Sequence, residues 1–248
     1  MKLSIVDGII QDDFLGRVPI VRSIIEPQGN VRNVRTLIAL DGPIGVTIHN
    51  TGNSNPSADA LAHAAWLDGV EAGDGDYIGA HFFVDAQRIV QVLPISEVSY
   101  HAGDGMGRGN GATVSIEICE TAPYEECEAV AAMLAAALMD TLGVENLYTH
   151  EMFNGKYCPR LILVREHGWE DFVGRVASFR GAWSMPAAPA PVLDNTASLW
   201  AQEAIDWALA NRFLVGDETG NLRLHEAATR EEVVVFLHRL FAEVTKNA

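Results

Sequence analysis

The sequence is poor in cysteine, in basic residues and in long apolar runs. Its three cysteines in 248 residues include no Cys-x-x-Cys pair, so a disulfide framework is not expected and a reducing compartment fits best. No apolar stretch approaches the roughly 18 residues of a membrane span. Lysine and arginine number 17 against 33 acidic residues, a formal net charge of −16. Without a basic stripe, we expect no binding to nucleic acid and no adhesion to an anionic membrane.

The N-terminal residues also lack the pattern of a secretory signal. Asp7 interrupts a short apolar run, and no small-residue cleavage site follows it. We therefore expect a cytoplasmic protein. Hydrophobic residues make up 48% of the chain and charged residues 20%, which is typical of a folded globular protein.

A proline- and alanine-rich stretch over residues 181–198 predicts a linker between a large domain, 1–180, and a small one, 199–248. In the large domain, β-branched and aromatic runs alternate with helical patterns. We predict strands at 46–49, 80–84, 88–93 and 113–119, and helices at 58–70, 125–142 and 171–179. The fold class expected is α/β, with a central mixed β-sheet flanked by helices.

The small domain is predicted to be α-helical. Apolar residues fall on one face of each of two segments, around Trp200–Ala208 and Val233–Phe241. A capping box, Thr229–Glu232, precedes the second segment. Two short helices bury little core alone, so a neighbouring surface or a second copy of the chain is an expected partner.

Two histidines and one cysteine are candidate ligands of a single zinc ion: His49, His150 and Cys158. His49 ends an apolar strand, and Cys158 follows His150 by a loop short enough to fold back. Three protein ligands with one open position are typical of a catalytic zinc site. The alternative is that two partly buried histidines and an unrelated free cysteine occur here by chance.

Glu117 and Lys156 are the candidate catalytic residues. Glu117 interrupts an apolar strand, where a carboxylate is costly unless it is solvated, paired or used as a general base. The alternative is a glutamate on an edge strand paired with an arginine. Lys156 lies two residues before Cys158, where its ammonium could stabilise a substrate oxyanion.

The glycine-rich segment around residues 101–111 matches no phosphate-binding motif and is interpreted as a mobile loop lining a substrate groove. We assign His101, at the mouth of that segment, and Asn50 to substrate binding; the alternative for His101 is an ordinary surface histidine. His81 and Cys119 are interpreted as core residues or supports of the site rather than ligands.

Several motifs, in order, resemble the zinc-dependent type-2 N-acetylmuramoyl-L-alanine amidases, especially endolysins of phages and prophages of Gram-positive hosts. The resemblance covers about residues 22–165. The segments that carry it are 27–33, 47–52, 80–85, 101–105, 115–120 and 150–159.

This resemblance implies that His49, His150 and Cys158 bind one Zn²⁺ and that Glu117 and Lys156 act in catalysis. It implies cleavage of the amide between N-acetylmuramic acid and the L-alanine of the peptidoglycan stem peptide. Some relatives carry a catalytic tyrosine just before the histidine at position 81. This chain has Ala80 there, which assigns the acid–base role to Glu117. An endolysin would remain in the cytoplasm until lysis and then act on the cell wall.

The tail resembles a single S-layer-homology repeat, on the basis of residues 200–205, 216–220 and 229–232. The resemblance implies binding of a secondary wall polymer, with Arg230 as the contact residue and Trp200 beside it. Such repeats usually occur in threes, so a single copy could instead serve in self-association.

Two other functions stay open at this point. A cytosolic muropeptide-recycling amidase would typically use aspartate as third ligand and need no wall-binding tail. A non-catalytic peptidoglycan-recognition protein would commonly lack the cysteine ligand.

Overall fold

The computed structural model describes residues 2–28, 33–73 and 77–184 of the larger part of the chain. In the tail it describes 195, 197, 201–211, 213, 214, 222, 224, 233, 234, 237 and 238. The chain divides into two compact units, Met1–Met185 and Pro186–Ala248. Trp200 and Arg230, the residues assigned to wall-polymer binding, lie outside the described residues.

A seven-stranded sheet forms the centre of the first unit, in the order β3-β4-β7-β6-β8-β5-β9. Its strands are β3 (Phe14–Leu15), β4 (Val18–Arg22), β5 (Gly45–Asn50), β6 (Phe82–Val84), β7 (Ile89–Gln91), β8 (Thr113–Ile118) and β9 (Asn146–Thr149). β8 and β5 run parallel to each other, β9 runs parallel to β5, and β6 pairs antiparallel with β7. The predicted mixed sheet is therefore confirmed. A separate hairpin pairs β1 (Ile5–Val6) with β2 (Ile9–Ile10).

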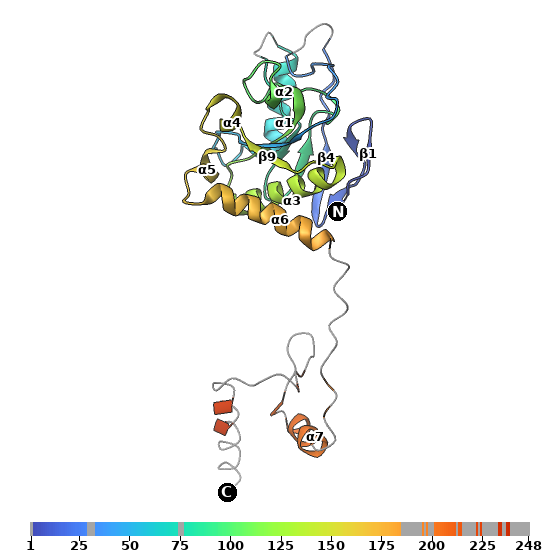
Figure 1. Ribbon diagram of the computed structural model, residues 1–248, viewed down its shortest axis with the longest axis vertical. Helices are drawn as coiled ribbons and strands as arrows, with labels where there is room; N and C mark the ends of the chain where they lie inside the picture. The colour runs from blue at the N-terminus through green and yellow to red at the C-terminus, as the bar shows by residue number, and fades with distance from the viewer. Residues whose placement is uncertain are drawn as a thin grey trace. The chain divides into compact units, whose positions relative to one another are not determined.

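Helices cover both faces of the sheet (Figure 1). α1 (Ala60–Glu71) packs on β6 and β7, and α3 (Tyr124–Leu142) packs on β5, β6 and β8. α6 (Gly168–Ser184) packs on the outside of α3. The short helices are α2 (Arg108–Ala112), α4 (Glu151–Asn154) and α5 (Arg160–Leu163), and the second unit contains α7 (Gln202–Ala210).

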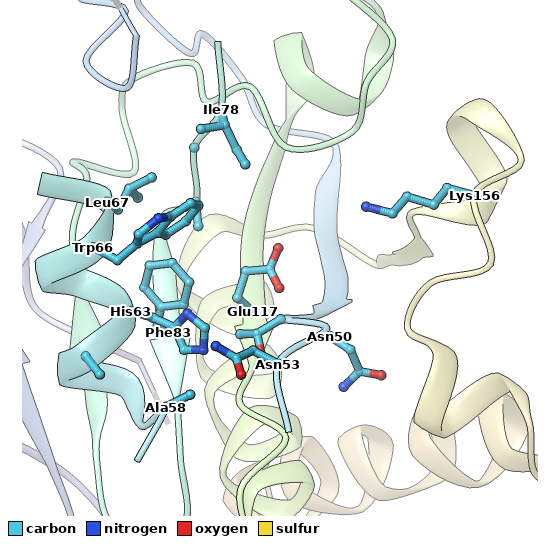
Figure 2. A pocket seen from close by; sticks show the side chains of 14 residues that line it. Asn50, Asn53, Ala58, His63, Trp66, Leu67, Ile78, Phe83, Glu117 and Lys156 are labelled. Carbon is cyan, nitrogen blue, oxygen red and sulfur yellow. The ribbon is translucent and has the colours of Figure 1, made fainter. Parts of the chain in front are cut away.

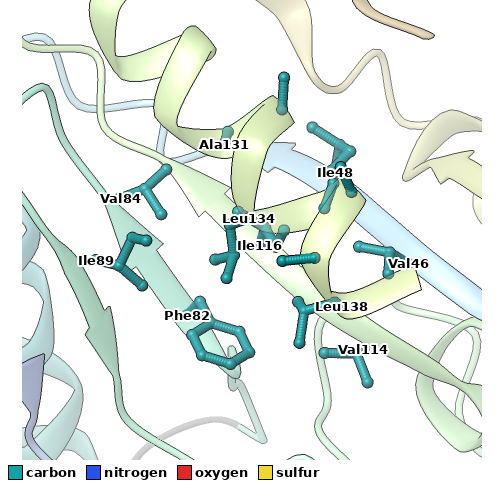
Figure 3. Close-up of a cluster of buried hydrophobic side chains, with 14 of the residues drawn as sticks. Val46, Ile48, Phe82, Val84, Ile89, Val114, Ile116, Ala131, Leu134 and Leu138 are labelled. Atoms are coloured by element: carbon teal, nitrogen blue, oxygen red, sulfur yellow. The ribbon is translucent and has the colours of Figure 1, made fainter. Parts of the chain in front are cut away.

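The alternation of side chains along the central strands assigns one face to the core and the other to the candidate site. Val46 and Ile48 of β5, and Val114 and Ile116 of β8, are fully buried under α3 (Figure 3). Their neighbours in sequence must point to the opposite face, because successive strand residues alternate. His49 and Glu117 are directly paired in the register of β5 with β8, so both side chains project from that second face.

β9 is the edge strand that carries the chain into the candidate site. Gly45 lies opposite Asn146, and a side chain on Gly45 would collide with the Asn146 carbonyl. Glycine therefore allows the two strands to approach at the start of their pairing. β9 ends at Thr149, which places His150 at the same end of the sheet as His49.

Two local predictions need correction. The strand expected at 80–84 begins only at Phe82, because the ring of His81 takes the place of a backbone partner: its Nδ1 accepts from the Ser115 amide at 3.0 Å. The glycine-rich segment is not an untethered loop. The Asp104 carboxylate accepts from the amides of Gly109 and Asn110, and Asn110 Oδ1 accepts from His101 and Ala102.

The other predicted strands and helices of the first unit are confirmed with shifted ends, and α6 is longer than expected. It continues to Ser184, into the stretch expected to be linker. The capping box Thr229–Glu232 and most of the segment Val233–Phe241 lie outside the described residues. Among the described residues, no helix has the length and apolarity needed to cross a membrane.

Candidate metal centre and substrate pockets

The three predicted metal ligands meet at one end of the sheet. His49 is on β5, His150 stands between β9 and α4, and Cys158 comes just before α5. All three side chains are buried, and their candidate ligand atoms lie within 4.8 Å of one another. In the part of the chain that the structure describes, this is the one group of three such residues close enough to share an ion.

The distances within this cluster fit a single zinc ion. The Nδ1 atoms of His49 and His150 are 3.1 Å apart, and Cys158 Sγ is 3.9 Å from His49 Nδ1. Ligand atoms at about 2.0–2.1 Å (nitrogen) and about 2.3 Å (sulfur) from a tetrahedral zinc lie about 3.3–3.6 Å from one another. Two imidazoles and a thiolate are also a donor set that zinc accepts readily.

The protonation of these groups is set by burial. Desolvation lowers the pKa of His49, and the neighbouring rings of His101 and His150 lower it further. His49 is therefore neutral, with a lone pair available for a metal. Burial raises the pKa of the Cys158 thiol to about 11, so formation of its thiolate requires a cation beside it.

His101 holds the ring of His49. Its Nδ1 lies 2.9 Å from His49 Nε2, and its Nε2 lies 3.4 Å from the hydroxyl oxygen of Thr113. That hydroxyl also contacts the hydroxyl of Thr47 at 2.6 Å. A ligand histidine whose other nitrogen is bonded in this way keeps a fixed orientation and tautomer. The contacts of His101 favour this supporting role over the substrate contact predicted from the sequence.

Asn50 is similarly engaged with the protein. Its side chain donates to the Tyr124 hydroxyl at 2.9 Å and accepts from the Leu161 amide at 2.9 Å. Its own amide donates to Cys158 Sγ at 3.4 Å. Asn50 therefore ties the Cys158 loop to β5, and only part of its surface faces a pocket.

Glu117 is partly buried beside the cluster, with its side chain 18% exposed. Its Oε1 lies 4.0 Å from His49 Nδ1, and its Oε2 has no hydrogen-bond partner within the described residues. Burial raises the pKa of Glu117 to about 7; Lys156 opposes this shift, and Glu120 adds to it. β8 is a central strand, so the alternative of an edge-strand glutamate paired with an arginine is wrong.

Two pockets flank the cluster. The first, about 370 Å³, is lined by Glu117 and by residues of α1, including His63 and Trp66. The second, about 820 Å³, is lined by His150, by His101 and by the glycine-rich segment. Lys156 lines both pockets. Figure 2 shows its ammonium directed toward Glu117 from the side opposite Trp66 and His63.

No sequence pattern indicates His63 and Trp66, because their place in a pocket depends on how α1 lies over β6. The interpretation of His81 as a core residue is confirmed, because its side chain is fully buried. Its Nδ1 lies 3.0 Å from Ser115 Oγ, and its Nε2 lies 2.8 Å from the Glu97 carbonyl oxygen. Cys119 is fully buried in the apolar cluster under α1, also as expected.

The chain was compared with known proteins. Residues 41–161 match the family model described as N-acetylmuramoyl-L-alanine amidase. The N-acetylmuramoyl-L-alanine amidase XlyA of Bacillus subtilis is 39% identical over 134 residues, which are 52% of this chain and 43% of that protein. This chain thus spans less than half the length of that curated relative.

Solved structures give the same result for the catalytic unit. The catalytic domain of XlyA is 36% identical, with a TM-score of 0.57, over 64% of this chain and 99% of that domain. A mutant endolysin from Bacillus subtilis matches with the same identity, TM-score and coverage.

A mixed sheet that brings two histidines and a cysteine together beside a partly buried glutamate is typical of a hydrolase domain with a candidate metal site. The comparisons specify which one. The chain belongs to the N-acetylmuramoyl-L-alanine amidase family, and the matched range includes every residue of the candidate centre.

Proposed function

We propose that this chain is a zinc-dependent peptidoglycan amidase of the endolysin type. It would cleave the amide between N-acetylmuramic acid and the L-alanine of the stem peptide. The observation that carries the proposal is the buried group of His49, His150 and Cys158 with Glu117 beside it, inside the range matched by the family.

His49, His150 and Cys158 would hold one zinc ion. When bound, zinc lowers the pKa of a coordinated water and polarises a substrate carbonyl. His101 keeps the His49 ring in the orientation that leaves Nδ1 toward the other two ligands. Asn50 holds the Cys158 loop against β5.

Glu117 would move the proton. As the water oxygen bonds to the carbonyl carbon, the Glu117 carboxylate takes a proton from that water. It then gives the proton to the alanine nitrogen as the carbon–nitrogen bond breaks, which leaves a lactyl carboxylate and a free amine. Lys156, on the opposite side of the pocket, would stabilise the negative charge on the substrate oxygen.

The test is release of amines from purified Gram-positive sacculi. We expect new L-alanine amino termini that disappear with a chelator and return when zinc is added back. Binding to sacculi with no new amino termini would contradict the proposal and favour a non-catalytic recognition protein. Cys158 argues against a recycling amidase, which would typically have an aspartate as third ligand. Faster turnover of small soluble muropeptides than of sacculi would favour that alternative.

The tail is proposed to be an S-layer-homology-like module that binds a secondary wall polymer, or that mediates self-association. Its support is the sequence resemblance, since Arg230 and Trp200 lie outside the described residues. The proposed site of action is the cell wall, reached from the cytoplasm at lysis. Its support is the similarity to an endolysin.

A further inference from the structure

The first pocket has one wall that the hydrolytic step does not use. Its volume of about 370 Å³ lies within the range of small-ligand sites, about 300–1,000 Å³. The side of the pocket away from the metal ligands includes residues of α1 and β6, and His63 is its buried polar member. Trp66 of the same helix is 52% exposed, so this wall combines an open aromatic edge with a buried imidazole.

His63 is held in place by ring stacking. Its ring stacks on Phe83, with centroids 5.3 Å apart and an interplanar angle of 15°. The residue is only 8% exposed, and its Nε2 is buried with no hydrogen-bond partner in the described part of the chain. A buried polar atom left unpaired is costly, so a partner supplied by a ligand would recover free energy.

The ring is also in a suitable state to recognise a polar group. Burial lowers the pKa of His63, while the carboxylates of Asp59 and Glu120 act in the opposite direction. The neutral imidazole has one donor and one acceptor nitrogen, so it can bind a carboxamide, a carboxyl group or a peptide unit.

The chemistry of the reaction determines which part of the substrate faces this wall. Glu117 must reach the departing nitrogen, and Glu117 lines the first pocket, whereas His150 and the glycine-rich segment line the second. The amine product is the stem peptide. Placing the stem peptide in the first pocket brings the departing nitrogen to Glu117 and leaves the second pocket for the muramyl group.

We propose that His63 is a substrate-binding residue whose Nε2 hydrogen-bonds a polar group of the stem peptide beyond its first alanine. This inference rests on the proposed amidase function. The alanine would lie next to Glu117 on β8, and the following residue would reach across the pocket to α1, where Trp66 covers it.

The experiment measures the activity of the wild type and of three variants on a longer and a shortened substrate. It uses the zinc-loaded full chain. The substrates are N-acetylmuramoyl-L-alanine and N-acetylmuramoyl-L-alanyl-D-isoglutamine. The variants are His63→Leu, which removes both nitrogens, and His63→Gln, which keeps a donor and an acceptor. Leu61→Ala is the control, because Leu61 is an exposed residue of the same helix.

For His63→Leu we expect KM on the longer substrate to rise about tenfold, as for one lost hydrogen bond in a buried site, with kcat changed by less than about twofold. On N-acetylmuramoyl-L-alanine this variant should match the wild type. His63→Gln should recover part of this loss. Leu61→Ala should leave KM and kcat unchanged on both substrates.

Equal losses on both substrates, or no loss on either, would overturn the role of His63. A wild-type enzyme that cleaves neither substrate would instead overturn the proposed function. In that case, binding of the peptide L-alanyl-D-isoglutamine to the wild type and to His63→Leu, measured by calorimetry, decides the question. Equal affinities would reject the inference, and a weaker affinity for the variant would support it.

Discussion

Cys158 is the residue whose chemistry depends most directly on a metal. Its thiol is buried, its pKa is raised by that burial, and the Asn50 amide already points at the sulfur. We predict that Cys158→Ser loses bound zinc and nearly all amidase activity, because a hydroxyl is a poor substitute for a thiolate ligand.

Metal content measured by mass spectrometry, alongside activity, checks this prediction. Cys119→Ala is the matched control, since Cys119 is equally buried but belongs to the apolar cluster under α1. The control should keep one zinc per chain. Full zinc occupancy in Cys158→Ser would remove Cys158 from the ligand set.

Replacing Glu117 should affect turnover without affecting metal binding. We predict that Glu117→Gln keeps its zinc, because Glu117 is not among the three ligands, but lowers kcat by about 10²–10⁴-fold. Steady-state kinetics on a soluble muropeptide, with zinc content measured on the same sample, provide the measurement. A variant with wild-type kcat would exclude Glu117 as the proton carrier.

His81 should make stability depend on pH. Burial lowers the pKa of His81 to about 4 from about 6.5. Between these two pH values, His81 is protonated in the unfolded chain and neutral in the folded chain. Its contribution to the free energy of unfolding is therefore complete above pH 6.5. It is lost as the pH falls toward 4, at up to about 1.4 kcal/mol per pH unit.

Urea unfolding at pH 7.5, 6 and 5 tests this prediction, with zinc-saturated protein throughout. His81→Gln should reduce the pH slope relative to the wild type, whereas His167→Gln, at an exposed histidine, should leave the slope unchanged. Identical slopes in all three proteins would show that His81 does not carry the effect.

For individual residues of the candidate site, the sequence predicts those that belong to short motifs. It does not predict those that only the packing of different elements brings together. His49, His150 and Cys158 lie in short segments with a recognisable pattern. His63 gave no signal because its significance depends on Phe83 and Glu117, which lie on other elements. His101 lines the second pocket, as its place at the glycine-rich segment suggests, but its contacts with His49 and Thr113 could not be predicted because those residues are distant in sequence.

Between elements, the contact of α3 with α6 depends on a buried charge. Glu128 of α3 is 0% exposed and lies 2.8 Å from Arg165 and 3.3 Å from Arg175. We predict that Glu128→Gln lowers the free energy of unfolding by roughly 2 kcal/mol, because it leaves two arginines facing an uncharged group. The arginines are more than one-third exposed, which keeps the cost below that of a fully buried pair.

Thermal unfolding followed by circular dichroism is the measurement. Glu145→Gln is the matched control: Glu145 also pairs with an arginine, Arg180 of α6, but its own side chain is 75% exposed. The midpoint should fall clearly for Glu128→Gln and little for Glu145→Gln. Equal shifts would contradict the importance assigned to burial.

The longest helix and the shortest strands differ most in how well the sequence predicts them. α3, with 19 residues rich in alanine, leucine and methionine, has a clear helical pattern and ends at Gly143 in a left-handed conformation. β1, β2 and β3 have two residues each, too few to show alternation. Their pairing is decided by tertiary contacts, such as the bond from the Ile10 amide to the Gln91 side chain.

For the whole molecule, the division after Met185 separates the candidate centre from the tail. Every described residue of the centre belongs to the first unit. We therefore predict that residues 1–185 alone hydrolyse a soluble muropeptide with a kcat within about twofold of the full chain. Kinetics on the two proteins make the comparison, and a large loss in the shorter one would give the tail a part in catalysis.

The same pair of proteins tests the tail. Pull-down on purified sacculi should retain less of the 1–185 protein than of the full chain if the tail binds a wall polymer. Equal retention would instead favour the self-association role, which sedimentation of the two proteins would measure.

The separation of the ligands along the chain has a consequence for biosynthesis. His49 and Cys158 are 109 positions apart. At about 5–20 residues per second, the ribosome adds the last ligand roughly 5–20 s after the first. During that interval the nascent chain carries His49, and later also Glu117, but cannot complete the candidate centre. The candidate centre can therefore assemble only when most of the first unit has been synthesised.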